Sequence, residues 1–359
     1  MTSRRSMLKL LAATSLLPAC AESDPGSGGS AGMGGMGTSG GAGAAGGAGM
    51  SGAGGAASTA PDKLIFLGTQ GGPRFNTMRG ETAAVMIIGD VPYMIDCGYG
   101  AFRGLLAASI DPLKVSQVFL THLHTDHVGD VAALLGLQWT QGRKDPVTVY
   151  GPYGTDALVT GAIAFNAADT RIRVADEGRT VMPGDIFKGV VSEATATPTK
   201  VYEDANITVT CCENTHYNDT VKAAIPDRSL AYRIDSKTRS IVFTGDTTYT
   251  ESIVQLAQGA DILVCECMDV VATRASFDAQ VAMGAYGDNP EGVWNHIVGA
   301  HTPCADMGKM ATAANVKKLV AYHLVPGALN GGEPDQTYID QIKTTFAGEI
   351  VIAADQMVL

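Results

Sequence analysis

The sequence is poor in basic residues and, after residue 60, it lacks long apolar runs. The 359 residues include 25 Lys and Arg against 36 Asp and Glu, and residues 61–359 keep 22 and 34 of these, a formal net charge of −12. Nucleic-acid-binding proteins usually gain affinity by releasing counterions to a basic surface, so this charge argues against an extended polyanion and favours a small anionic substrate. No run of about 18 apolar residues follows residue 60, and we expect no membrane span there.

Disulfides are not indicated either, although the chain has seven cysteines. Most of them lie in or beside apolar runs that are typical of buried strands, where cysteine behaves as a small apolar side chain. Only one residue separates Cys265 from Cys267, so they do not form a CxxC redox motif. We therefore expect mostly free thiols.

The N-terminal segment has the pattern of an export address. Arg4 and Arg5 before an apolar run resemble a twin-arginine signal, and a Leu-Pro-Ala-Cys run ending at Cys20 resembles a lipobox. We expect residues 1–20 to be an export signal with this lipobox and residues 21–60, mostly Gly, Ala and Ser, to be a disordered tether. This predicts a periplasmic or outer-membrane lipoprotein that meets the membrane only through its lipid anchor. An ordinary cleaved signal is the alternative.

Residues 61–359 are predicted to form one domain rich in strands. From residue 63, short apolar runs alternate with turn residues as in a β-meander, and a strand over residues 115–121 runs directly into a group of histidines. The second half repeats strands and helices, and residues 346–359 suggest a final hairpin-like pair of strands. Two β-rich halves with helices outside predict an α+β fold, a four-layer αββα sandwich.

Histidine is scarce, yet three of the seven histidines fall within six residues. His122, His124 and His127 lie beside Asp126 at the C-terminal end of a predicted strand. Imidazole and carboxylate groups are ligands that zinc and related first-row metals bind. A chance accumulation of histidines at the start of a helix is the alternative, but the step from strand to loop favours a metal site.

The run from His122 to His127 resembles the His-x-His-x-Asp-His signature of the metallo-β-lactamase superfamily, and the resemblance extends over residues 62–359. It implies that Asp96 orients the metal-binding loop. It also implies two Zn2+ or other first-row divalent ions, with a bridging hydroxide as nucleophile. The implied ligands are His122, His124 and His216 for the first ion, Asp126, His127 and His323 for the second, and Asp246 as a bridge.

Residues 299–326 resemble ribonuclease Z and the zinc-dependent arylsulfatase-like hydrolases. The resemblance implies that His301 is a general acid. A neighbouring carboxylate would raise the pKa of such an acid, and Glu266 matches the glutamate of the subfamily's His-Glu-Ala-Thr segment, although the first and last members here are Cys265 and Met268. The candidate catalytic residues are therefore Asp126, His301 and Glu266. His296, five residues before His301, either lines the pocket or has a surface or structural role.

The interval between His216 and Asp246 favours the arylsulfatase-like branch. Only 29 residues separate them, which leaves no room for the basic arm with which ribonuclease Z grips transfer RNA. The predicted activity is hydrolysis of a small phosphodiester or sulfate ester, with no extended nucleic acid as partner. The alternatives are a ribonuclease Z-type endoribonuclease, a cyclic-nucleotide phosphodiesterase, a lactonase or β-lactamase, and a non-catalytic metal-binding lipoprotein. A homodimer is left open.

Residues 269–295 form an additional stretch before His301. Tyr286 and Trp294 within it could stack on a flat leaving group, which would make the stretch a lid over the site. They could equally pack a surface insertion.

Overall fold

The computed structural model describes residues 62–72, 78–327 and 335–359. The predicted export signal, lipobox and tether lie outside these residues and stay predictions, as does the domain boundary at residue 61. The described residues belong to one compact unit, Ala56–Leu359. None of their helices is long and apolar enough to span a membrane.

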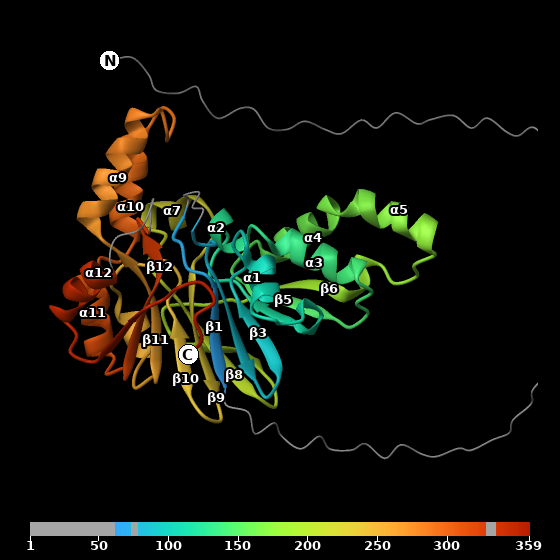
Figure 1. Ribbon diagram of the computed structural model, residues 1–359, viewed down its shortest axis with the longest axis horizontal. Coiled ribbons are helices and arrows are strands. Elements are labelled where there is room, and N and C mark those ends of the chain that lie inside the picture. The colour runs from blue at the N-terminus through green and yellow to red at the C-terminus, as the bar shows by residue number, and fades with distance from the viewer. Residues whose placement is uncertain (1–61, 73–77, 328–334) are drawn as a thin grey trace, which may run out of the picture. The chain divides into compact units, whose positions relative to one another are not determined.

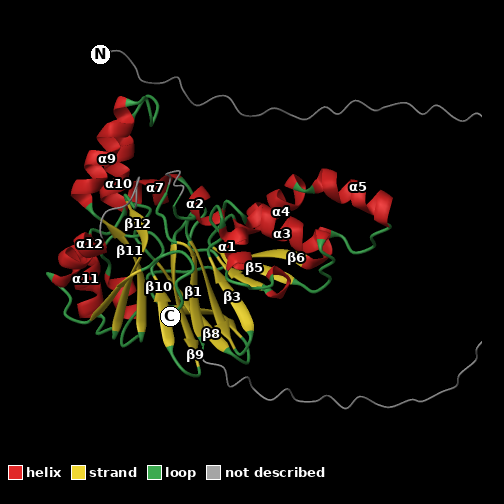
Figure 2. Cartoon of the chain, viewed as in Figure 1, coloured by secondary structure: helices red, strands yellow, loops and turns green. Residues whose placement is uncertain are grey.

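Two mixed sheets form the centre of this unit (Figure 2). The first has six strands among the described residues. In the order in which they pair, these are β1 (Lys63–Gly68), β2 (Ala83–Ile88), β3 (Val91–Ile95), β4 (Gln117–Phe119), β5 (Val147–Gly151) and β6 (Phe187–Val191). The first three strands pair antiparallel, as the predicted meander requires, and β3 to β6 pair parallel.

The second sheet has seven strands in the described part of the chain. In pairing order these are β13 (Glu349–Ile352), β12 (Lys318–Val325), β11 (Ile262–Met268), β10 (Ser240–Phe243), β9 (Leu230–Ser236), β8 (Ile207–Glu213) and β7 (Thr199–Glu203). Strands β7 to β10 pair antiparallel, whereas β10 to β13 pair parallel.

The hairpin expected at residues 346–359 is wrong. Strand β13 pairs parallel with β12, and the residues after it cross to the first sheet, where the backbone N–H of Leu359 donates to the carbonyl of Leu64 at 2.8 Å. The two apolar runs thus complete different sheets instead of pairing with each other. Apolar patterning predicts that a segment is extended, but it does not specify the partner strand.

Side chains alternate along the strands and build a core on both faces of each sheet. In β1, Leu64 and Phe66 pack between the two sheets, whereas Ile65 and Leu67 pack toward helices on the outside. All six cysteines of the described residues are buried free thiols. The predicted four-layer αββα sandwich is confirmed (Figure 1).

Helices cover the outer face of each sheet. The first sheet shares a core with α1 (Ala101–Ala107), α3 (Val131–Thr140) and α4 (Thr155–Phe165). The second sheet shares a core with α8 (Glu251–Leu256), α11 (Cys304–Ala313) and α12 (Asp335–Lys343). The shorter or more peripheral helices are a 3-10 helix (Pro112–Lys114), α2 (Thr125–Val128), α5 (Ala167–Glu177), α6 (Pro183–Ile186) and α7 (Asp219–Ala224).

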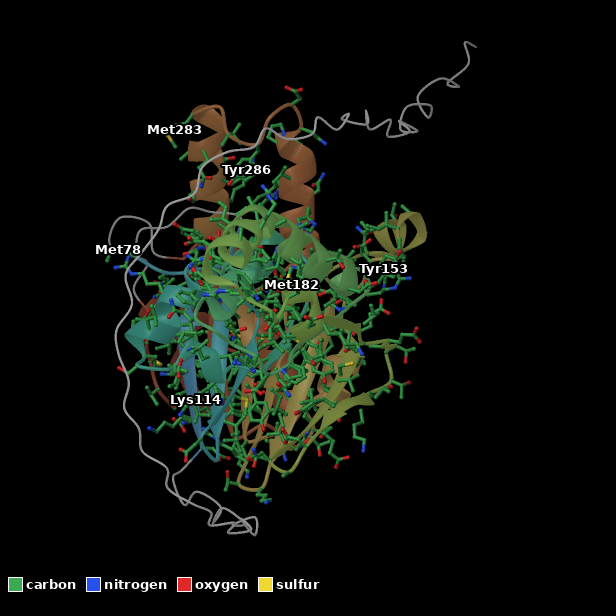
Figure 3. The ribbon with its side chains drawn as sticks, turned by 90° about the vertical axis from the view of Figure 1, so that its right-hand side faces the viewer. Met78, Lys114, Tyr153, Met182, Met283 and Tyr286 are labelled. Carbon is green, nitrogen blue, oxygen red and sulfur yellow. The ribbon has the colours of Figure 1, made fainter. Side chains whose placement is uncertain are left out.

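The additional stretch before His301 is a pair of helices, α9 (Val270–Ala282) and α10 (Pro290–Ala300), which stands out from the sandwich (Figures 1 and 3). Phe277 of α9 is buried between them; the ring of Tyr286 stacks on it at 4.7 Å, and the ring of Trp294 lies 5.4 Å away. The aromatic side chains of this stretch therefore pack the two helices against each other.

Candidate active site

The candidate site lies where strands of both sheets end. Asp96 follows β3, the histidine run follows β4, His216 follows β8 and Asp246 follows β10. Side chains that are far apart in the sequence meet there because the C-terminal ends of these strands share one edge of the sandwich. All seven predicted ligands fall into two adjoining groups of potential metal-binding atoms.

Three imidazoles form the first group. His124 Nδ1 lies 3.1 Å from His122 Nε2 and 3.1 Å from His216 Nε2. The other nitrogen of His216, Nδ1, donates to the carbonyl oxygen of Ala300 at 3.0 Å, so its Nε2 carries a lone pair toward His124. Imidazole nitrogens that approach so closely repel one another unless a proton or a cation lies between them, and the group therefore fits a metal ion.

The second group consists of four buried residues, Asp126, His127, Asp246 and His323. Asp246 lies between the two groups. Its Oδ2 atom is 3.8 Å from His122 Nε2 and 3.1 Å from His323 Nε2, and its Oδ1 atom is 3.3 Å from His127 Nε2. This is the place that a carboxylate shared by two metal ions would occupy.

Asp96 lies behind the second group and fixes the orientation of His127. Its carboxylate accepts from the backbone N–H of Thr121 at 2.7 Å and from His127 Nδ1 at 2.8 Å. Because Nδ1 is directed at Asp96, Nε2 is the atom of His127 that faces Asp246. Within the described part of the chain, His127 Nε2 and Asp246 Oδ1 are two of several buried polar atoms without a hydrogen-bond partner, and at this place they are free to bind a metal.

His323 reaches the site through an irregularity in β12. Tyr322 pairs with Glu266 of β11, and Leu324 pairs with the next residue of that strand. His323 is thus an extra residue in its strand, a β-bulge, and its backbone has a φ of 45°, which is uncommon for a non-glycine residue. The bulge turns the imidazole toward the second group.

A loop that follows β1 closes on the second group. The backbone N–H of Gly72 donates to Asp126 Oδ2 at 2.9 Å. A Cβ atom at position 72 would overlap the carboxylate of Asp126, so glycine is required there. This contact was not predicted from the sequence, although the Gly71-Gly72 pair after a predicted strand is a signal for it.

The protonation states favoured at the first group suit metal binding. Burial lowers the pKa of His122 and of His216 well below the usual histidine value, so both rings are neutral. At the second group burial would lower the pKa of His127 and of His323, but the charge of Asp246 outweighs burial and raises both, so these rings hold protons that a metal ion would displace. Burial tends to raise the pKa of Asp126, but the charge of His127 outweighs this effect and lowers it. Neutral imidazoles and ionised carboxylates are the forms that bind metals. The two groups can therefore hold metal ions.

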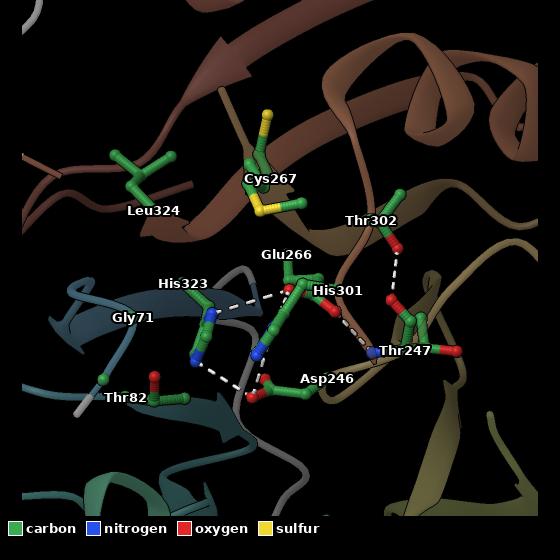
Figure 4. Close-up of polar contacts among 12 residues, drawn as sticks. Gly71, Thr82, Asp246, Thr247, Glu266, Cys267, His301, Thr302, His323 and Leu324 are labelled. Carbon is green, nitrogen blue, oxygen red and sulfur yellow. Dashed lines mark hydrogen bonds and ion pairs between the residues drawn. The ribbon is translucent and has the colours of Figure 1, made fainter. Parts of the chain in front are cut away.

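His301 and Glu266 form a buried pair beside Asp246 (Figure 4). His301 Nδ1 is 2.7 Å from Glu266 Oε2 and 3.8 Å from Asp246 Oδ2. The backbone N–H of Thr247 donates to Glu266 Oε1, and Thr302 Oγ1 donates to the carbonyl of Thr247 at 2.7 Å. Since Nδ1 is directed at Glu266, Nε2 is the atom of His301 that can pass a proton to a substrate.

Glu266 favours the protonated form of His301. Burial alone would lower the pKa of His301, but the charge of Glu266 and its hydrogen bond outweigh burial and raise it. A histidine that stays protonated near neutral pH can act as a general acid. The predicted general acid and its carboxylate partner therefore lie in contact.

Two further polar side chains lie against the first group. His296, whose role the sequence left open, is exposed on α10, and its ring centroid lies 5.3 Å from that of His216. Although the residue as a whole is exposed, partial burial of its ring among the site histidines, with the nearby charge of His301, lowers the pKa of His296 to about 4. Tyr217, which sequence reasoning missed, has its ring centroid 5.5 Å from that of His124.

Comparison with protein families matches residues 93–324 to the beta-lactamase superfamily domain. The chain belongs to the metallo-β-lactamase superfamily. The matched region contains every predicted metal ligand and both members of the His301–Glu266 pair. This metallo-β-lactamase-fold protein is a metal-dependent hydrolase that acts on ester bonds, as the sequence predicts.

Similar curated proteins are named Ribonuclease Z. The one from Mycobacterium bovis (strain BCG / Pasteur 1173P2) is 28% identical over 296 residues, which cover 82% of this chain and 96% of the relative. The one from Anoxybacillus flavithermus is 25% identical and covers 82% of this chain and 95% of the relative.

Solved structures share the fold. The metallo-beta-lactamase fold protein YhfI from Bacillus subtilis has 20% identity and a TM-score of 0.57, covering 84% of this chain and 100% of that one. Human tRNase Z, short form, has 19% identity and a TM-score of 0.54, covering 83% of this chain and 98% of that one.

The prediction that no extended nucleic acid is a partner is wrong. Relatives named Ribonuclease Z match this hydrolase over nearly their whole length, and a protein named tRNase Z has its fold. Net charge is a property of the whole surface, and a few contacts around the cleaved bond do not require a basic body. The short interval between His216 and Asp246 excludes a large arm at that point only.

Proposed function

We propose that this hydrolase cleaves phosphodiester bonds and that RNA is its substrate class. The observation that carries the proposal is the His301–Glu266 pair, which places a protonated imidazole 3.8 Å from the Asp246 carboxylate. Hydrolysis of a phosphodiester needs an activated water on one side of phosphorus and a proton for the departing oxygen on the other. RNA is favoured because the relatives that match over most of this chain are named Ribonuclease Z.

Zinc ions are the metals that we propose for the two groups, because buried imidazoles and carboxylates suit zinc. Such ions, when bound, would lower the pKa of a water molecule and stabilise charge on the phosphoryl oxygens.

The protein's own residues orient the site and supply the proton. Asp96 and the carbonyl of Ala300 fix the rings of His127 and His216 through their Nδ1 atoms. His301 donates from Nε2 to the departing ribose oxygen, which leaves poorly as an alkoxide.

A substrate panel tests this function on the full chain. We expect turnover of bis-p-nitrophenyl phosphate and of an end-labelled RNA, loss of both with a chelator, and recovery with zinc. An Asp246→Ala variant should have no activity on either substrate. Turnover of p-nitrophenyl sulfate alone would support the arylsulfatase-like activity instead. Turnover of nitrocefin or a lactone alone, or none by metal-loaded protein, would also contradict the proposal.

A further inference from the structure

His296 lies at the edge of the site without being needed as a metal ligand. It stands on α10, and its ring centroid is 5.8 Å from that of His301 and 6.0 Å from that of His124. A side-chain nitrogen of His296 lies within 4.8 Å of the corresponding atoms of His216 and His301. However, His216 directs Nε2 at His124 and Nδ1 at the carbonyl of Ala300, so it has no nitrogen left for an ion beside His296.

A purely structural role does not explain the position of His296. Among the described residues its ring has no hydrogen-bond partner, and the residue is exposed. A histidine that stabilised α10 would be expected to bond a backbone or side-chain group of the fold. The imidazole instead keeps its polar atoms available on the side of the two groups.

In residues 62–72, 78–327 and 335–359, no lysine or arginine forms an ion pair with the carboxylates of this site. Within the described part of the chain, the ion pairs of Asp126, Asp246 and Glu266 are all formed with histidines. Among the described residues, the groups beside these carboxylates that can donate to a phosphoryl oxygen are imidazoles, whereas many phosphate sites present arginine or lysine. Each available imidazole donor then matters for binding.

We propose that His296 is a phosphoryl-binding residue that holds a non-bridging oxygen of the scissile group while His301 faces the departing oxygen. The proposal rests on the phosphodiesterase function argued above. A hydrogen bond places a donor nitrogen about 2.9 Å from its acceptor oxygen. Nitrogens that lie within 4.8 Å of each other can therefore both reach oxygens of one tetrahedral phosphoryl group. Helix α10 carries His296 and ends directly before His301, so it presents both donors to the substrate.

The test compares three variants on α10. His296→Ala removes the donor, His296→Gln keeps an N–H group, and Asn295→Ala changes the exposed neighbouring residue as a matched control. The probe is inorganic phosphate, and its affinity for the zinc-loaded protein is measured by calorimetry. Zinc content and the KM and kcat for bis-p-nitrophenyl phosphate are measured beside it.

We expect His296→Ala to weaken phosphate binding about tenfold, as loss of a hydrogen bond to a charged group does. KM should rise by a similar factor with a smaller change in kcat. His296→Gln should recover part of both losses, and Asn295→Ala should resemble the wild type. Zinc content should be unchanged in all three.

Unchanged phosphate affinity in His296→Ala would overturn the proposal, and so would loss of zinc, because the residue would then support the metal groups. Phosphate binding needs no turnover. If the wild type cleaves no phosphodiester but binds phosphate through His296, the proposed function fails while the subsite stands.

Discussion

The pKa of a buried histidine at this site depends on the group that its Nδ1 atom contacts, as His216 and His301 show. The carbonyl of Ala300 accepts from His216 Nδ1, and a neutral carbonyl leaves burial free to lower the pKa of that ring. Glu266 accepts from His301 Nδ1, and its full negative charge raises the pKa of His301. One histidine is therefore suited to bind a metal and the other to hold a proton, although both rings are buried.

Removal of the Glu266 charge should move the pH dependence of the reaction. In the wild type His301 stays protonated up to its raised pKa, and activity should fall as the pH rises through that value. In Glu266→Gln only the more distant charge of Asp246 still opposes burial, so the pKa of His301 should fall and the same loss of activity should occur at a lower pH. The measurement is the pH profile of kcat/KM for a phenyl phosphodiester, whose leaving group needs protonation. On the alkaline side the loss should reach about 100-fold.

The matching p-nitrophenyl diester provides the control substrate, since its leaving group needs little protonation, and Glu251→Gln, at an exposed position on α8, is the control variant. Equal losses on both diesters, or an alkaline limb that does not move, would count against His301 as the acid.

Some of the elements that hold the site could be predicted from the sequence, and others could not. Apolar alternation predicted most strands, and the histidine run predicted the loop of candidate ligands after β4, because local periodicity and short spacing are properties of the chain itself. The β-bulge at His323 and the contact of Gly72 with Asp126 were not predicted. Both arise from pairing between distant segments, which a single sequence does not specify.

The packing of helices α9 and α10 against each other should affect the first group of candidate ligands, although both helices stand outside the sandwich. Phe277 is only 2% exposed and packs between the two helices. Phe277→Ala should destabilise the pair by about 3–5 kcal/mol. Because the carbonyl of Ala300 at the end of α10 orients His216, zinc affinity at the first group should also fall, by about tenfold. Hydrogen exchange over residues 270–300 and zinc titration against a competing chelator measure the two effects.

Val271→Ala on the same helix is the control, since Val271 is 81% exposed and its truncation should change neither quantity. Faster exchange in Phe277→Ala with unchanged zinc affinity would show that the first group does not depend on α10.

For RNA as the proposed substrate, the acidic charge of the whole molecule bears on how the RNA is held. The chain carries a formal net charge of −11, and only histidines pair with the site carboxylates in the described part of the chain. Each phosphate neutralised by a lysine or arginine releases counterions and makes binding depend on salt. RNA that is held mainly at the cleaved phosphodiester should therefore release few counterions.

Salt titration of RNA cleavage tests this mode of binding. A protein with six to ten basic phosphate contacts loses about 10³- to 10⁵-fold in affinity between 50 and 200 mM salt. For this hydrolase we expect KM for RNA to rise by less than about tenfold over that range, because only one or two phosphates should be neutralised. Bis-p-nitrophenyl phosphate, a single phosphodiester, gives the salt dependence of the metal site alone. The result that would contradict this expectation is a far steeper rise of KM with salt for RNA than for this small substrate. It would mean that lysines and arginines away from the site bind the RNA, so that the surface has a basic region despite the net negative charge.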